Sequence, residues 1–211
     1  MIGYEAGVPL TSPPGYLHAR LFASLAPLVV LVFGIGAGAQ AIGGSEEAGT
    51  LEPLLANPVT RRRVAAERYL AIVALLVVLV AAFTLALVAF GAPFEVLDGV
   101  SLTGLLGACA GVFGIALLHA SVAFAVGAAT GRRGPAIAVA TAVAVGGYLV
   151  QSLLSLTGAL APLRAITPWH WYLDRNMLAE GPAVAAIVLP VVVSVPVVLI
   201  GWAAFRRRDL R

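Results

Sequence analysis

Few side chains in this sequence could do chemistry, and the densest group lies in residues 44–64, GSEEAGTLEPLLANPVTRRRV. The apolar stretches hold no Ser/His pair, paired carboxylates or H-E-x-x-H arrangement, which argues against hydrolytic chemistry inside them. The three histidines, His18, His119 and His170, have no carboxylate at ligand spacing and do not predict a zinc site. A phosphate-binding G-x-x-x-x-G-K-[ST] loop is excluded because the sequence contains no lysine.

Residues 44–64 predict a short helix enclosed by caps and turns. Ser45 can cap a helix start, where Glu46 and Glu47 would complement the helix dipole. Gly49 interrupts that turn, and Thr50 can cap a second short helix. The remaining signals are Pro53 in the first turn of that helix, the helix-ending Asn57 and Pro58, and Thr60, which can cap the next helix.

Leu51, Leu54 and Leu55 share one face of this short helix through their i, i+3, i+4 spacing. A connector that lies on lipid headgroups would also have such a face. Two features favour a groove on a soluble partner instead: the acidic pair would face a leaflet that repels acid, and the leucine face is short. We therefore interpret residues 43–68 as a cytoplasmic coupling loop between the membrane and another protein.

The rest of the sequence is so apolar that it predicts a lipid bilayer as the surrounding medium. Hydrophobic residues make up 61% of the 211 residues and charged residues only 11%, whereas a soluble domain carries roughly a quarter charged residues. The composition predicts one all-α transmembrane domain over residues 1–211, with residues 1–19 as a lightly structured segment outside the bilayer. Five stretches have about the 20 residues that a span needs: 21–42, 69–90, 101–130, 136–156 and 183–205.

The arginines predict the orientation of these spans. Ten of the thirteen basic residues, all of them arginine, fall in three alternate segments: 43–68, 131–135 and 206–211. The positive-inside rule places these segments and the C-terminus in the cytoplasm, and residues 157–182 outside. Short clusters at the ends of apolar runs do not indicate a nucleic-acid-binding face. The N-terminus would lie outside although no signal peptide precedes it, so we expect a further span upstream of this sequence.

A few polar residues and glycines lie within the spans. His119 is ionisable at membrane depth, which indicates either a functional residue or a neutral histidine bonded to a neighbouring helix. Tyr148 and Gln151 could line a substrate path or bond between helices. The pairs Gly34/Gly38 and Gly107/Gly111 fit either dimer contacts or close helix packing within the chain. For each of these residues, both a functional role and a role in packing between helices stay open.

The segment before the last span contains Trp169, Trp171 and Tyr172, which are typical membrane-interface anchors. Charged residues accompany them at Asp174, Arg175 and Glu180.

Three motifs resemble the ABC-2 type transporter permease family. Residues 46–61, EEAGTLEPLLANPVTR, resemble its E-E-x-G-T-L-x-x-L-L-x-x-P-V-[ST]-R signature. Residues 167–181, TPWHWY through Gly181, resemble its P-[FW]-x-W-Y…G segment, and residues 205–210, FRRRDL, resemble its F-x-R-R-D-[LI] ending. The resemblance covers nearly all of residues 15–211 and departs from the family in the absent first helix.

The resemblance implies one half of a six-helix bacterial exporter in the inner membrane. A second permease half, identical or different, and two ATPase subunits that carry ATP and magnesium would complete it. External helices that re-enter the outer leaflet before the last span would cover the substrate path. The residues implied for ATPase coupling are Glu46, Glu47, Gly49, Thr50, Leu51, Leu54, Leu55, Pro58 and Arg61. The residues implied for the external gate are Pro168, Trp169, Trp171, Tyr172 and Gly181.

We expect the cargo to be a hydrophobic or amphipathic compound, such as a drug, as in multidrug efflux, a lipid or a lipid-linked compound. This chain would hold no cofactor of its own. Two other classes remain open: a membrane scaffold whose loop binds a partner without coupling, and an intramembrane enzyme that uses His119 or His170 with a carboxylate.

Overall fold

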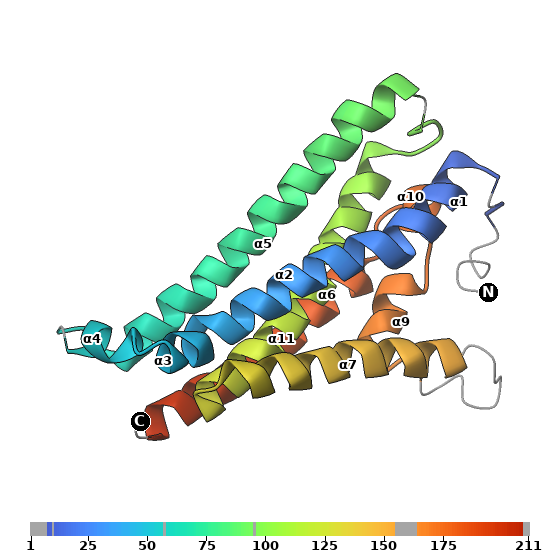
Figure 1. Cartoon of the computed structure of the whole chain (residues 1–211). Coiled ribbons are helices and arrows are strands. Elements are labelled where there is room, and N and C mark those ends of the chain that lie inside the picture. The colour runs from blue at the N-terminus through green and yellow to red at the C-terminus, as the bar shows by residue number, and fades with distance from the viewer. Residues whose placement is uncertain (1–7, 10, 57, 95, 155–163, 209–211) are drawn as a thin grey trace. The chain divides into compact units, whose positions relative to one another are not determined.

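The computed structural model describes residues 8–9, 11–56, 58–94, 96–154 and 164–208 (Figure 1). All regular secondary structure in this part of the chain is helical. Five helices are long and apolar enough to cross a membrane: Pro13–Glu47, Arg61–Gly91 (α5), Leu102–Thr130 (α6), Arg133–Leu154 (α7) and Val184–Arg207 (α11). The chain is therefore an all-α, multi-pass membrane protein, and all five predicted spans are present.

The first long helix begins at Pro13, eight residues before the expected start at Leu21. Ser12 caps it by accepting a hydrogen bond from the amide of Gly15 at 3.3 Å, and Pro13 and Pro14 occupy its first turn. Proline suits this position because amides of the first turn have no partner within the helix. The expectation of a lightly structured segment is thus wrong for residues 13–19.

This first helix contains two π-helical stretches. Its parts, in order, are α1 (Pro13–Leu17), π-helix η1 (His18–Leu25), α2 (Ala26–Ala39), π-helix η2 (Gln40–Gly44) and α3 (Ser45–Glu47). The wider turn of a π-helix changes the i to i+4 pattern of backbone bonding. The shorter helices in the rest of the described residues are α4 (Leu51–Leu55), the 3-10 turn η3 (Ala92–Phe94), α9 (Pro168–Leu173) and α10 (Met177–Glu180).

The chain forms two compact units, and each of the five long helices contributes to both. Unit 1 comprises Met1–Val30, Val77–Ile115 and Gly147–Pro190. Unit 2 comprises Leu31–Leu76, Ala116–Gly146 and Val191–Arg211.

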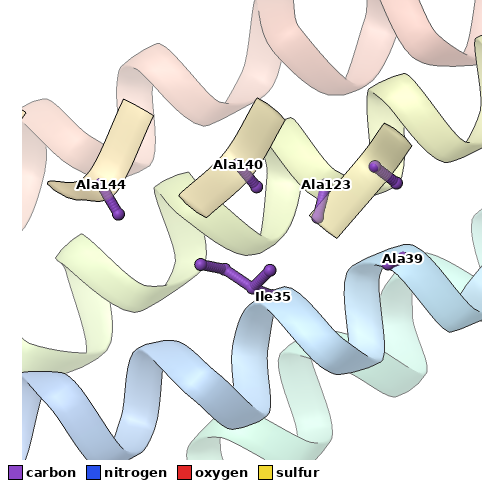
Figure 2. Packing of buried hydrophobic residues seen from close by; sticks show 6 residues of the cluster. Ile35, Ala39, Ala123, Ala140 and Ala144 are labelled. Carbon is purple, nitrogen blue, oxygen red and sulfur yellow. The ribbon is translucent and has the colours of Figure 1, made fainter. Parts of the chain in front are cut away.

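Small residues build the core of unit 2. Gly38 of α2 lies against α6, where an added Cβ would touch the carbonyl oxygen of Ala120 and lie 3.0 Å from the Cβ of Ala123. Helices in lipid lack a hydrophobic drive to associate, so small residues at their contacts allow the close van der Waals packing that holds them. The Gly34/Gly38 pair packs within the chain rather than remaining free for a dimer contact. The buried cluster around it (Figure 2) contains Ile35, Ala39, Ala123, Ala136, Ala140 and Ala144.

In unit 1 two glycines of α6 leave room for the segment that precedes α11 to pack closely against this helix. A Cβ added at Gly107 would lie 2.6 Å from the Cβ of Pro182. One added at Gly111 would lie 2.9 Å from the Cε of Met177 and 3.0 Å from the Cδ2 of Tyr172. The second glycine pair is therefore also used for packing within the chain.

Replacing Gly38 by alanine is expected to lower the free energy of unfolding by about 1–3 kcal/mol, because the new methyl group meets the backbone of α6. The matched control is Gly36→Ala in the same helix, where an added Cβ meets nothing within 4 Å. That change should be neutral or stabilise by up to about 1 kcal/mol through helix propensity. Unfolding in detergent micelles measures both, and equal losses would contradict the packing described.

Candidate functional site

The coupling stretch, residues 45–61, begins as a continuation of the first long helix. Helix α3 ends at Glu47, and Gly49 then adopts φ +67°, a conformation that glycine reaches without strain. The predicted break at Gly49 is confirmed, and so is the short helix α4 that follows it. Thr60 caps α5 as predicted, because its hydroxyl accepts a hydrogen bond from the amide of Arg63 at 3.3 Å.

Of two predicted caps in this stretch, Ser45 is wrong and Thr50 is right in position only. Ser45 lies inside a continuous helix, where its buried hydroxyl is 3.2 Å from the carbonyl oxygen of Gln40 and accepts a hydrogen bond from Arg68 Nη1 at 3.1 Å. Thr50 makes no side-chain cap for α4, since its hydroxyl donates to the carbonyl of Ser45 at 2.9 Å. Both hydroxyls bond backward to the preceding turn, so they hold the coupling stretch onto the first long helix.

The leucine face of α4 is turned largely into the chain. Leu51 is completely buried and Leu54 is half-buried. The side chain of Leu55 and all of Asn57 lie outside the described residues. The residues that this stretch exposes instead include Glu47, Gly49, Thr50, Glu52, Pro53, Ala56 and Pro58.

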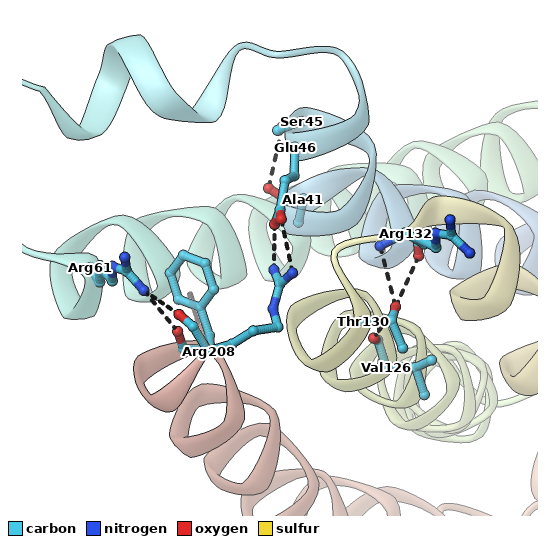
Figure 3. Close-up of polar contacts among 9 residues, drawn as sticks. Ala41, Ser45, Glu46, Arg61, Val126, Thr130, Arg132 and Arg208 are labelled. Carbon is cyan, nitrogen blue, oxygen red and sulfur yellow. Dashed lines mark hydrogen bonds and ion pairs between the residues drawn. The ribbon is translucent and has the colours of Figure 1, made fainter. Parts of the chain in front are cut away.

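Arg61 joins the far end of the coupling stretch to the end of α11 (Figure 3). Its Nη1 donates to the carbonyl oxygen of Arg208 at 2.7 Å and lies 3.5 Å from that of Phe205. Its guanidinium group also lies 5.9 Å from the centre of the Phe205 ring, within the range of a cation–π contact. Because carbonyls at a helix end lack partners within the helix, a cation is stabilised there.

Glu46 joins the near end of the coupling stretch to the same turn of α11. Both of its carboxylate oxygens accept hydrogen bonds from Arg208, with Nη1···Oε1 at 2.8 Å (Figure 3). The side chains of Glu46 and Arg208 are only 7% and 21% exposed. A bidentate pair of this kind is among the strongest hydrogen-bonded contacts available to side chains.

The turn between α6 and α7 completes this arrangement. Gly131 has φ +68°, and an added Cβ would lie 2.6 Å from Oε1 of Glu46 and touch the guanidinium of Arg208. A Cβ added at Gly43 would lie 2.8 Å from the carbonyl oxygen of Arg132. Glycine is thus needed at 131 both for its backbone conformation and to leave room for the ion pair.

The segment before α11 folds into α9 and α10. Thr167 caps α9 by accepting a hydrogen bond from the amide of His170 at 3.3 Å, Pro168 is its first residue, and Gly181 with φ +90° ends α10. Trp169 and Tyr172 are buried, and Trp171 donates from Nε1 to the carbonyl of Ala165 at 2.6 Å. The buried aromatic residues therefore attach this segment to its own chain.

Tyr172 bonds directly to the π-helix η1. Its hydroxyl donates to the carbonyl oxygen of Phe22 at 2.5 Å. Burial raises the pKa of the Tyr172 phenol well above its ordinary value, so the group remains a neutral donor at physiological pH.

The three polar residues expected along a substrate path lie in different settings. Gln151 is buried and accepts a hydrogen bond from the hydroxyl of Thr167 at 2.9 Å. The ring of Tyr148 meets that of Trp169 edge to face, with centroids 5.0 Å apart. His119 is buried in α6 within unit 2. For Gln151 and Tyr148 the contacts agree with bonding between helices, while a pathway role stays a prediction.

The sequence interpretation gave no histidine a carboxylate at ligand spacing, and the structure differs from it at His170. Nδ1 of His170 lies 3.6 Å from Oδ1 of Asp174, four residues later at the C-cap of α9. Within the described ranges, no three His, Cys, Asp or Glu side chains are grouped to hold a metal ion.

Sequence reasoning missed three residues of this site: Arg68, Gly131 and Arg208. Arg68 was interpreted only as a topology signal, Arg208 as a topology signal and part of the family-like FRRRDL ending, and Gly131 had no assigned role. Phe205 and Arg208 are spaced i, i+3 and so share a helix face, which was the available signal; their partners are far away in the sequence.

The chain matches the model of a protein family described as ABC-2 family transporter protein over residues 9–210. No curated protein matches the chain significantly.

Tyr172→Phe is expected to lower the free energy of unfolding by about 1–3 kcal/mol, because the carbonyl of Phe22 loses its buried donor. Tyr16→Phe is the matched control, since Tyr16 is 57% exposed, and should change stability by less than about 0.5 kcal/mol. Thermal unfolding in detergent compares them. A Tyr172→Phe variant as stable as Tyr16→Phe would show that the bond contributes nothing.

Proposed function

The chain belongs to the ABC-2 transporter family, and on that premise we propose that it is the permease half of an exporter driven by a separate ATPase. The family establishes a membrane permease of an ABC transporter and implies an ABC ATPase partner in general terms. The proposal adds that the coupling stretch is where a dimer of that ATPase docks, and that two permease halves form one transporter. The nucleotide and its magnesium would be bound by the partner.

The observation that carries the proposal is the fixed position of the coupling stretch. Its base is held by Arg68 on Ser45, by Arg208 on Glu46 and by Arg61 on the end of α11. Its surface is exposed at Glu47, Glu52 and other residues around α4. A held base and an exposed surface are what a segment needs if it is to pass a partner's movement to the spans.

The expected docking face is revised by this geometry. Because Leu51 is buried, its side chain packs α4 against the rest of the chain and does not enter a groove on a partner. The exposed carboxylates of Glu47 and Glu52 favour a partner surface with complementary positive charge.

The cargo that fits the spans is hydrophobic or amphipathic: a drug, a lipid or a lipid-linked compound. The helices α5, α7 and α11 are mostly unburied along their apolar windows, which suits contact with lipid. ATP binding and hydrolysis on the partner would rock the spans and open a site within them to each side in turn. The segment formed by α9 and α10 would cover the external end of the path.

The proposed location is the bacterial inner membrane with the coupling stretch and C-terminus in the cytoplasm. Nine described arginines support this orientation, because they fall at the ends of helices within unit 2: Arg61, Arg62, Arg63, Arg68, Arg132, Arg133, Arg206, Arg207 and Arg208.

Docking is tested by reversing exposed charges on the coupling stretch. The double variant Glu47→Arg, Glu52→Arg should lower the affinity for the copurified ATPase by about tenfold or more, which corresponds to about 1.4 kcal/mol, because two favourable contacts become repulsive. Glu67→Arg in α5 is the control, since Glu67 is also exposed but lies outside α4. Titration of the ATPase onto the permease in lipid discs measures each affinity.

Equal affinities for the double variant and the control would contradict docking at this stretch. An ATPase that binds but whose turnover is unaffected by the permease would favour the scaffold interpretation.

The orientation is tested with single cysteines in a Cys109→Ala background, which is otherwise free of cysteine. A membrane-impermeant maleimide added to intact cells should label Arg175→Cys and leave Glu52→Cys unlabelled until the membrane is opened. Both positions are exposed in the protein. The opposite labelling would invert the proposed topology and remove the coupling stretch from the ATPase.

A further inference from the structure

The end of α11 has a role that neither the family match nor the arginine distribution assigns. We propose that Arg208, together with Phe205, passes movement of the coupling stretch into α11, so that the last span directly receives the stroke of the ATPase. The inference rests on the proposed function and adds the route by which movement enters the spans.

The coupling stretch is tied to one turn of α11 on both sides of α4. Before α4, Glu46 is bound by the guanidinium of Arg208. After α4, Arg61 donates to the carbonyl of Arg208 and lies over the ring of Phe205. The segment 47–60 is therefore closed at its base by residues 205–208. A displacement of the coupling stretch that moves Glu46 and Arg61 and keeps these bonds must displace the end of α11 with it.

The Glu46–Arg208 ion pair is less exposed than an ordinary surface ion pair. Its two side chains are 7% and 21% exposed, whereas those of Arg63 and Glu67 in α5 are 70% and 60% exposed. Exposed pairs are loosened by water and salt, while buried bidentate pairs hold one geometry. The Glu46–Arg208 pair can thus act as a link, and the Arg63–Glu67 pair serves as its matched control.

The positive-inside rule does not explain Arg208. Arg206 and Arg207 beside it are exposed and already provide positive charge at this end of α11. Arg208, the residue that follows α11, lies three positions after the buried Phe205. Its guanidinium group lies so close to Gly131 that no larger residue fits at position 131. The three neighbouring arginines therefore divide into two for the membrane surface and one for the coupling stretch.

The experiment uses the full chain with its copurified ATPase in lipid discs, with Ala203→Cys in the Cys109→Ala background. Ala203 is exposed on α11, one turn or so before Arg208, and carries a spin label whose mobility is recorded with and without ATP plus vanadate. Arg208→Gln should keep the ATPase bound but reduce the nucleotide-induced spectral change by about fivefold or more, the lower range of coupling between sites. Arg63→Gln should leave the change as in the parent.

Two further variants separate a link from a mere structural contact. The swap Glu46→Arg with Arg208→Glu should restore the response, because it re-forms the pair. Arg61→Gln cuts the second tie and should reduce the response in the same direction, so it decides the matter if the swap does not fold.

An undiminished response in Arg208→Gln and Arg61→Gln would overturn the inference. So would loss of ATPase binding in Arg208→Gln, because the pair would then build the docking surface instead of transmitting movement. If no ATPase binds the unmodified chain, the proposed function itself is wrong. If the complex forms and the spin label responds equally in every variant, only this inference is wrong.

Discussion

Lipid offers helices no hydrophobic reason to associate, and the architecture of this protein depends on that constraint. Contacts must come from close van der Waals packing and from a few hydrogen bonds between helices. Gly38 brings α2 against the backbone of α6, and the hydroxyls of Tyr69 and Ser121 lie 2.8 Å apart between α5 and α6. Surfaces packed this closely cannot deform gradually, so any working motion must move whole helical segments.

Lipid also confines charged residues to the ends of helices, where individual charged residues have different roles. Arg206 and Arg207 are exposed, and exposed charges of this kind contribute little to the stability of a fold. Arg61 and Arg208 instead occupy positions where backbone carbonyls and a buried carboxylate need partners. With charged residues at only 11% of the chain, an ion pair whose side chains are only 7% and 21% exposed is a feature that the fold maintains against a partial desolvation cost.

The sequence predicted what depends on composition and on neighbouring residues. Hydropathy located all five spans, and local signals located Gly49, α4 and the Thr60 cap. It failed where partners are distant or compete: Ser45 and Thr50 bond backward instead of capping, since preceding carbonyls lie within reach. The link between Glu46 and Arg208 spans 162 positions, and no local pattern specifies such a contact.

The face of α4 shows why amphipathicity alone could not define the docking surface. A leucine stripe predicts that one side of a short helix will be covered, but it is silent on whether the cover is another protein or the same chain. In this protein the cover over Leu51 is the chain itself. What remains outside is a turn with φ +67° at Gly49, flanked by the carboxylates of Glu47 and Glu52. On the proposed function, recognition of the ATPase at this surface relies on shape and charge, and its association rate should fall as ionic strength rises.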